Sequence, residues 1–302
     1  MAILNTSQLQ LPGTMLGIVR DKALDAGLLG KLSQEKPTLF GPVKGATFSG
    51  VPRASIVGES EAKPADDPFQ ITPFSADPIK FIIQTRASDE FRWADDDYKL
   101  GVLKELVAPA IGAGMGRAVD LIAIHGINPK TGQPASKITK HLSQATSTVV
   151  PSGAPTAELN QAVGLLAAQS FMPTGIATDP AYNYSLATEV YPAGHSLAGQ
   201  SIYPQATFAG TSNWRGLKVE SSSTVSGKPE LATDAKIKAI LGDWSEVRWG
   251  FQRNFPLEIL TAGDPDNSGR DLAGHNEIMF RTEAVVYVAI GDLKKFALVK
   301  EA

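Results

Sequence analysis

The sequence predicts an α+β fold in which strands and one long helix build a common body. Three observations predict it. Apolar residues recur at every third or fourth position over residues 95–125, the period of a helix. Residues 79–86 and 280–290 alternate on a period of two, as strands do. Residues 56–70 form an acidic stretch broken by prolines, which is too polar to bury itself and indicates a long exposed hairpin.

Composition limits the classes of protein to consider. With 302 residues and 43% hydrophobic residues, the chain can form one large or two modest folded domains. A net charge of only -3 is not that of a dedicated nucleic-acid binder, although it suits a wall that faces nucleic acid without gripping it. The chain has no cysteine, so disulfides and thiolate metal sites are excluded.

The sequence also indicates a soluble protein made in a cytoplasm. The N-terminus lacks the basic segment and apolar core of a secretory signal. The least polar stretch, residues 106–124, contains a proline, three glycines, Arg117 and Asp120, and is therefore a poor membrane span.

The first elements are an arm and a hairpin. Residues 1–45 are predicted to be an extended arm with a short helix over 20–31, which must dock on some surface to offset its loss of conformational entropy. Residues 46–57 and 79–86 are predicted to be the two strands of a hairpin spanning 46–86. Its prolines stiffen it and discourage edge pairing. A plain surface hairpin on a monomer is the alternative.

The longest helix is predicted over residues 95–125, about 46 Å in length. Ser88 or Asp89 can cap its start, Pro109 should bend it, and Gly126 should end it. Its glycine-rich middle suits close packing against a sheet. The elements expected after it are a polar boundary at 126–155, a helix at 156–169 capped by Thr156, a strand at 175–178, a helix from Pro180, loops at 192–235, strands near 236–240 and 246–260, and final strands at 280–290 and 296–299.

Four short stretches, taken in order, carry a resemblance to a known family. They are residues 57–64 as an extension-loop tip, 120–126 as the end of a spine helix, 242–245 with Arg253 as a "GDxS … R" strand pair, and 280–284 with 290–296 as a final strand and tail. Together they resemble the major capsid proteins of tailed bacteriophages, which have the Hong Kong 97-like (Johnson) fold.

The resemblance implies an α+β capsid fold with an N-terminal arm, an extended hairpin loop, a long spine helix, and peripheral and axial domains. The expected boundaries are 1–45 for the arm, 46–86 for the extension loop, 87–150 for the peripheral domain, 151–262 for the axial domain, and 263–302 for a C-terminal strand returning to the peripheral domain.

The function that the resemblance implies is mechanical. Pentamers and hexamers would form the icosahedral shell around double-stranded DNA, which they enclose without sequence-specific binding. Assembly would take place in the host cytoplasm, and the product would be the virion capsid. The expected partners are a portal, a separate scaffolding protein, because the arm begins near Met1, and a decoration protein. No cofactor, metal or membrane is expected.

Two sets of site residues follow from the resemblance. The extension loop is expected to contact basic residues of a neighbouring subunit, which sets register more than affinity. The residues are Glu59, Glu61, Lys63, Asp66 and Asp67 on the loop and Arg86, Arg92 and Lys99 on the neighbour. In one branch of the family a loop lysine forms an isopeptide bond with an asparagine, helped by a glutamate; the matching residues are Lys63, Asn276 and Glu283. A raised glutamate pKa would allow it to deprotonate the lysine.

Other functions fit less of the chain. An encapsulin, a bacterial compartment shell with the same fold, is the main alternative. A serine hydrolase using Ser196 with Asp264 and His275 follows the chain order of known triads, but Ala198 replaces a required glycine.

Binding sites for small groups have still weaker support. Gly112, Gly114 and Gly116 lie inside a helical pattern rather than in a dinucleotide loop, and indicate close packing. The histidines lack ligand spacing for a metal, and the tryptophans suit core or interface positions. These residues are His125, His141, His195 and His275, and Trp93, Trp214, Trp244 and Trp249.

Overall fold

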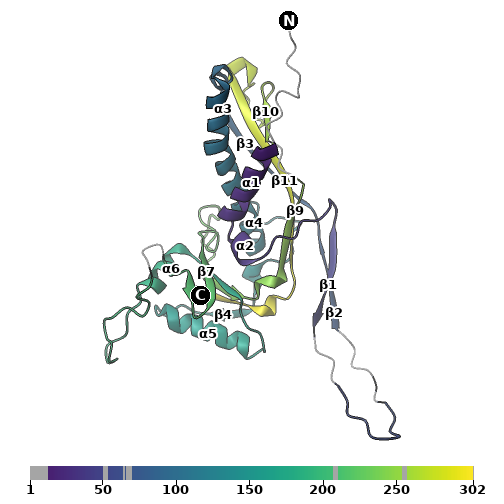
Figure 1. Ribbon diagram of the computed structural model, residues 1–302, viewed down its shortest axis with the longest axis vertical. Helices are drawn as coiled ribbons and strands as arrows, with labels where there is room; N and C mark the ends of the chain where they lie inside the picture. Colours follow the sequence, from purple (N-terminus) through teal and green to yellow (C-terminus); the bar gives the residue numbers. More distant parts are fainter. Residues whose placement is uncertain are drawn as a thin grey trace.

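The protein contains two sheets, a long helix that shares a hydrophobic core with both, and a hairpin that projects from the body (Figure 1). The computed structural model describes residues 13–49, 54–63, 65, 70–206, 210–253 and 257–301. Much of the chain forms runs of helices or runs of strands, such as β1 to β3 and β6 to β12, and the sheets are mainly antiparallel, so the predicted α+β class is confirmed.

The first sheet is built around the longest strand, β11 (Glu277–Ile290). Strand β3 (Ile79–Ser88) lies antiparallel along one side of β11, with Ile79 opposite Val286. Strands β9 (Val247–Arg253) and β10 (Leu257–Leu260) follow one another along the other side, also antiparallel. The strand predicted at residues 280–290 is therefore confirmed, and the structure places it at the centre of a sheet.

The predicted pairing of the hairpin strands is wrong. Residues 79–86 do not return along the hairpin, because they form β3 of the first sheet. The hairpin consists of β1 (Val43–Ser49) and β2 (Gln70–Ala76), with Val43 opposite Ala76. Alternation identifies a strand but not its partner, and both β2 and β3 lie within range of β1 in the sequence.

The long helix runs from Asp96 to His125 in three parts: α3 (Asp96–Val102), a π-helical turn (Leu103–Val107) and α4 (Ala108–His125). In a regular helix the amide at position 109 would donate to Glu105, and proline has no amide hydrogen. The helix accommodates this missing hydrogen bond by a π turn, in which the Ala108 amide donates to the Leu103 carbonyl. The end at Gly126 is confirmed, with φ of 67°.

The N-terminal segment differs from the prediction. Instead of one helix over 20–31 in an extended arm, it forms α1 (Gly13–Ala26) and α2 (Leu28–Leu32). Helix α1 packs on α4 so closely that a Cβ at Gly116 would lie 2.3 Å from the Ala23 carbonyl oxygen. A Cβ at Gly114 would lie 2.9 Å from the end of the Ile83 side chain of β3. The glycines therefore serve close packing, as predicted, and the nucleotide-loop alternative is wrong.

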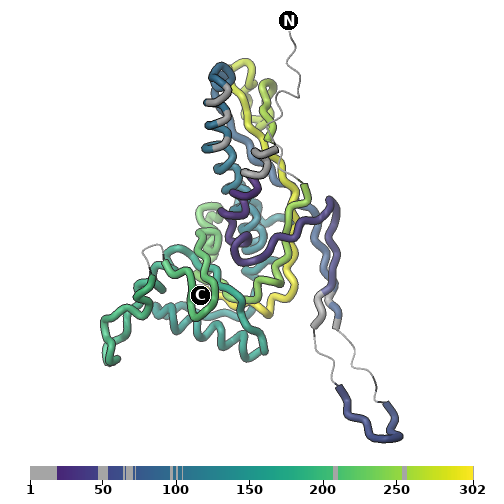
Figure 2. Tube along the Cα trace, in the orientation of Figure 1, coloured from purple at the N-terminus to yellow at the C-terminus, as the bar shows by residue number. Residues whose placement is uncertain are grey.

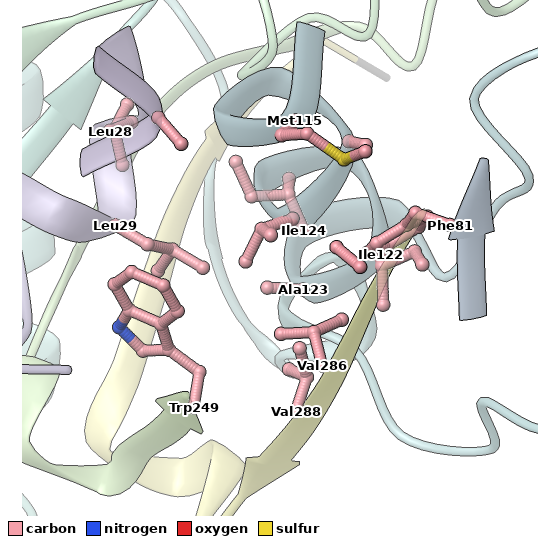
Figure 3. Packing of buried hydrophobic residues seen from close by; sticks show 14 of the residues in the cluster. Leu28, Leu29, Phe81, Met115, Ile122, Ala123, Ile124, Trp249, Val286 and Val288 are labelled. Atoms are coloured by element: carbon pink, nitrogen blue, oxygen red, sulfur yellow. The ribbon is translucent and has the colours of Figure 1, made fainter. Parts of the chain in front are cut away.

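The core fills both sides of α4. Figure 3 shows Met115 and Ile122 beside Phe81 of β3, and Leu29 of α2 beside Trp249 of β9. Val286 and Val288 of β11 complete this cluster, and all these side chains are buried. Within the described chain one helical stretch, Glu105–His125, is long and apolar enough to cross a membrane, but its apolar window is 67% buried in the protein.

The second sheet has six strands in the order β4-β12-β8-β5-β7-β6. Their bounds are β4 Ser147–Val149, β12 Phe296–Lys300, β8 Ile237–Gly242, β5 Gly175–Thr178, β7 Leu217–Ser221 and β6 Asn213–Trp214. Helix α5 (Pro155–Ala167) covers it together with α6 (Pro180–Ala187). The predicted strand at 175–178 and the helix from Pro180 are confirmed.

Two expectations for this half need correction. Thr156 does not cap α5; the helix begins at Pro155, and its own Glu158 carboxylate accepts the amides of residues 152–154. The end of the chain does not stay with β11. A turn at Gly291 and Asp292 sends β12 into the second sheet between β4 and β8, so the two sheets share the C-terminal segment.

Candidate functional site: the assembly surfaces

Among its described residues, the β1–β2 hairpin is anchored to the body at its base. Ala76, Phe74 and Val43 pack with Tyr287 and Ala289 of β11 in a small separate cluster. The guanidinium of Arg248 lies 4.9 Å from the centre of the Phe74 ring, where a cation is attracted to the ring face. Beyond this base the hairpin leaves the body altogether (Figure 2). Its direction is therefore set by β11, while the described tip residues, 54–63 and 65, lie away from the body.

The described part of the tip is fully open to solvent. Glu59, Glu61 and Lys63 are exposed. Asp66 and Asp67, which were also predicted as contact residues, lie outside the described residues. Glu61 closes a turn, because its carboxylate accepts the Gly58 amide at 2.8 Å. The tip thus presents charged groups to whatever surface it meets.

Apolar side chains on and beside the hairpin are also uncovered. We call them the hairpin surface: Leu39, Phe40, Ile56, Val57 and Ile71. The side chain of Ile56 is fully exposed and that of Leu39 is 92% exposed. Burying one such side chain contributes about 1.5–3 kcal/mol. This burial free energy is absent in a lone subunit and would be gained when a partner covers the side chain.

A second uncovered surface lies at the start of the long helix. We call it the helix-end surface: Trp93, Tyr98 and Leu106, with exposed fractions of 74%, 59% and 64%. The other tryptophans are buried in the core. Arg92 pairs with Asp89 at 3.0 Å beside Trp93, and Lys99 lies half-buried on α3. Two of the three basic residues predicted to meet a neighbour are therefore next to residues of this apolar surface in the sequence.

Arg86, the third residue predicted as a basic contact, forms ion pairs within its own chain instead. Its guanidinium binds Asp264, Asp266 and Glu277, which follow far along the sequence. No sequence pattern near Arg86 predicts these partners. The closely spaced aspartates within residues 264–271 are the sequence signal that could have drawn attention to them.

Sequence reasoning also missed Asp120 of α4. Its buried carboxylate accepts the amides of Leu28 at 2.8 Å and Leu29 at 3.0 Å, at the start of α2, and the Thr224 hydroxyl at 3.4 Å. Burial raises its pKa to about 6, although the hydrogen bonds oppose this. Asp120 therefore ties the N-terminal helices to the long helix. The sequence signal that could have revealed this role is a single acidic residue within an apolar helical stretch.

Comparison with known proteins identifies the family. No protein-family model and no curated protein matches the chain. A structure described as Mycobacterium phage Ogopogo is 35% identical over 100% of both chains, with a TM-score of 0.78. The chain belongs to the major capsid proteins of tailed bacteriophages.

Other solved structures share the fold of this capsid protein. One described as Gordonia phage Cozz is 23% identical, covers 91% of this chain and 86% of its own, and has a TM-score of 0.74. One described as the capsid of an empty GTA particle computed with C5 symmetry is 12% identical, covers 92% and 90%, and has a TM-score of 0.63. The Hong Kong 97-like capsid fold and a structural role in the virion capsid follow.

The residues considered for cross-linking do not meet within one capsid subunit. Lys63 is exposed on the hairpin tip. Asn276 immediately precedes β11 and Glu283 lies on it seven residues later, about 23 Å away at the usual strand rise. The raised pKa expected for Glu283 is not found. A hydrogen bond from Lys80, at 2.8 Å, lowers its pKa, and the charges of Lys80 and Arg253 act in the same direction.

The hydrolase alternative is wrong. Ser196 lies in the exposed loop after α6, whereas Asp264 and His275 lie in the loop after β10 at the opposite end of the molecule (Figure 1). Asp264 is bound by Arg86, and the His275 ring contacts the Asp271 carbonyl. In the part of the capsid subunit that the structure describes, no three His, Cys, Asp or Glu side chains form a group that could hold a metal.

Proposed function

We propose that this capsid protein assembles as pentamers and hexamers into the icosahedral shell that encloses the double-stranded DNA of a tailed phage. One observation carries the proposal: in the part of the hairpin that the structure describes, apolar residues are uncovered and the contacts with the body lie at the base. The fivefold symmetry in the description of the GTA capsid supports it. The modest net charge of -3 suits a wall that contains DNA without binding its bases.

The hairpin and helix-end surfaces are complementary in chemistry. One offers apolar residues with Glu59 and Glu61, and the other offers Trp93 with Arg92 and Lys99. We infer that the hairpin of one subunit lies on the helix-end surface of its neighbour. The apolar side chains would supply the free energy, and the charges would set the register. Asp66 and Asp67 would add to the acidic side. Arg86 does not enter this contact, because its guanidinium is occupied.

Further partners belong to the same proposal. A portal, a separate scaffolding protein and a decoration protein are expected with a shell of this type, and assembly is expected in the host cytoplasm. The phage structures among the matches favour this function over an encapsulin compartment.

Covalent cross-linking is a separate and finer proposal. Lys63 of one subunit would reach Asn276 of a second. Because Asn276, just before β11, is about 23 Å from Glu283 on β11, the assisting glutamate would come from a third subunit. Mature particles would then give a ladder of covalent oligomers on a denaturing gel, and Lys63→Ala would abolish it. A single monomer band from wild-type particles would end this proposal.

Assembly is tested by charging the hairpin surface. In Ile56→Asp we expect particles to be lost by electron microscopy while the melting curve of the subunit is unchanged, since Ile56 touches nothing in its own chain. Met172→Asp is the matched control, because Met172 is 70% exposed and lies outside both assembly surfaces. Normal particles from Ile56→Asp, or a wild-type chain that stays monomeric at high concentration with its phage's other capsid-assembly proteins present, would contradict the proposal.

A further inference from the structure

Strand β3 lies at the edge of the first sheet. It ends the order β10-β11-β3, and in the part of the chain that the structure describes no strand pairs with its other side. With ten residues it is longer than most strands. Proteins usually shorten, bend or cover such an edge, because its free amides and carbonyls can bind another strand. The outer edge of β3 is therefore open to a further strand.

A groove of about 610 Å³ runs along this open edge, and we call it the edge groove. Six consecutive residues of β3, 79–84, line it. Since successive side chains of a strand point to opposite faces, a surface lined by six residues in a row follows the edge of the strand. The turn at residues 128–131 also lines the groove, and α4 contributes Gly114, Met115, Ala118 and Ile122.

The edge groove lies where the next strand of the sheet would pack on α4. Phe81 of β3 already lies against Met115 and Ile122 (Figure 3). Neighbouring strands are about 4.8 Å apart, so a strand added beside β3 would hold its inner side chains over α4 as well. Gly114 and Ala118 are small residues one helical turn apart, and they leave room for larger side chains from that strand.

The chain itself contains a segment that fits this groove. Residues 1–12 lie outside the described residues, and they include no charged side chain. Within them residues 6–11 read TSQLQL, in which Leu9 and Leu11 alternate with glutamines. A period of two is that of a strand with one apolar face. Six residues of strand span about 20 Å, the same length as residues 79–84 in the groove.

The position of α1 favours a second subunit as the source of this segment. Helix α1 packs on the face of α4 that carries Gly112 and Gly116, and Gly114 lies about 200° round the helix from Gly112. Passing round half of a helix about 10–12 Å wide takes roughly five extended residues. In the same subunit that path would use Leu9 and Leu11, which closely precede α1, so they would not reach the groove.

We propose that residues 6–11 of one capsid subunit bind as a strand along β3 of a neighbouring subunit, with Leu9 and Leu11 in its edge groove. The inference rests on the proposed shell, which brings subunits together, and adds a contact to that of the hairpin. Hydrogen bonds to the β3 backbone supply affinity, and the alternating leucines supply specificity. Docking also offsets the conformational entropy that an extended segment loses.

Cysteine cross-linking tests the contact directly, because the wild-type chain has no cysteine. Gln10 would face away from α4, as do alternate residues of β3, and facing residues of neighbouring strands are close enough for a disulfide. Mild oxidation of assembled particles should give a ladder of covalent oligomers on a non-reducing gel, and reductant should remove it. The variants combine Gln10→Cys in turn with Lys80→Cys, Ile82→Cys and Gln84→Cys.

The matched control combines Gln10→Cys with Met172→Cys. Met172 is 70% exposed and lies outside the edge groove, so this pair should stay monomeric. A ladder from the control, or no cross-link from any of the three β3 pairs, would overturn the proposal. Thiols that are consumed within single chains would overturn it too, because each subunit would then fill its own groove.

Two charge-matched variants test the alternation. Leu9→Asp with Leu11→Asp places carboxylates in the groove, whereas Gln8→Asp with Gln10→Asp places them on the outer face. We expect the first pair to raise the concentration needed for assembly by about tenfold or more, and the second to change it little. Neither should change the Tm of unassembled subunits. Equal effects of the two pairs on assembly would refute the strand.

A peptide keeps this test separate from that of the shell. A labelled peptide of residues 1–12 is titrated with unassembled full-length subunits and followed by fluorescence anisotropy. It should bind saturably, and the same peptide with Leu9→Asp and Leu11→Asp should bind at least about tenfold more weakly. Saturable binding by a chain that forms no shells would refute the proposed function alone. Shells whose unassembled subunits do not bind the peptide would refute the strand contact alone.

Discussion

The buried carboxylate of Asp120 should make the stability of the subunit fall as pH rises from 4 to 7. Its pKa is about 6 in the folded chain, against 3.8 for an aspartate free in water. The folded state therefore favours the protonated acid. The stabilising effect is fully present below about pH 3.8 and is lost as pH rises through 6. A difference of about two pKa units corresponds to about 3 kcal/mol.

The assay compares wild type with Asp120→Asn, which cannot ionise. The free energy of unfolding is measured by denaturant titration of unassembled subunits between pH 4 and pH 7. The variant loses part of an acceptor for the Leu28 and Leu29 amides, which lowers its stability by about 1–3 kcal/mol at acid pH. As pH rises, wild type should lose about 3 kcal/mol relative to the variant. A difference between the two proteins that stays constant over this range would refute the reasoning.

Other predictions concern packing and assembly. Gly116→Ala should destabilise the subunit by about 1–3 kcal/mol, because the new methyl group meets the Ala23 carbonyl. The control is Gly164→Ala, in open space on α5, which should stabilise the subunit by about 0.5–1 kcal/mol. Equal effects of the two substitutions in thermal melts would contradict the close packing of α1 on α4. Trp93→Ala should raise the concentration needed for assembly, measured by light scattering, without lowering Tm, and a lowered Tm would place Trp93 in the core instead.

Local patterns predicted the elements well where they depend on neighbours in the chain. The helix over 95–125, its end at Gly126 and the strand at 280–290 are all confirmed. Side-chain periodicity and a left-handed glycine are properties of a few adjacent residues, so they can be read directly. The π turn before Pro109 was expected only as a bend, since proline shows that a hydrogen bond is missing but not how the helix adjusts.

Pairing was predicted less well because it depends on residues far apart in the chain. Residues 79–86 were correctly seen as a strand but given the wrong partner, which is β11, about 200 residues further on. At the candidate site, too, the local feature was predicted and the long-range contact was not. The exposed hairpin tip was predicted, whereas Arg86 was assigned to a neighbouring subunit although Asp264 and Glu277 of its own chain hold it.

The sequence by itself determined which segments become helix or strand, where glycine permits close approach, and that a charged hairpin would lack a place in its own body. Only the tertiary structure decided which strands share a sheet, which apolar side chains stay uncovered, and which charges are already neutralised. The physical reason is range: backbone preference acts over a few residues, while hydrogen-bonded pairing, burial and ion pairing depend on distances in space that the folded chain alone sets.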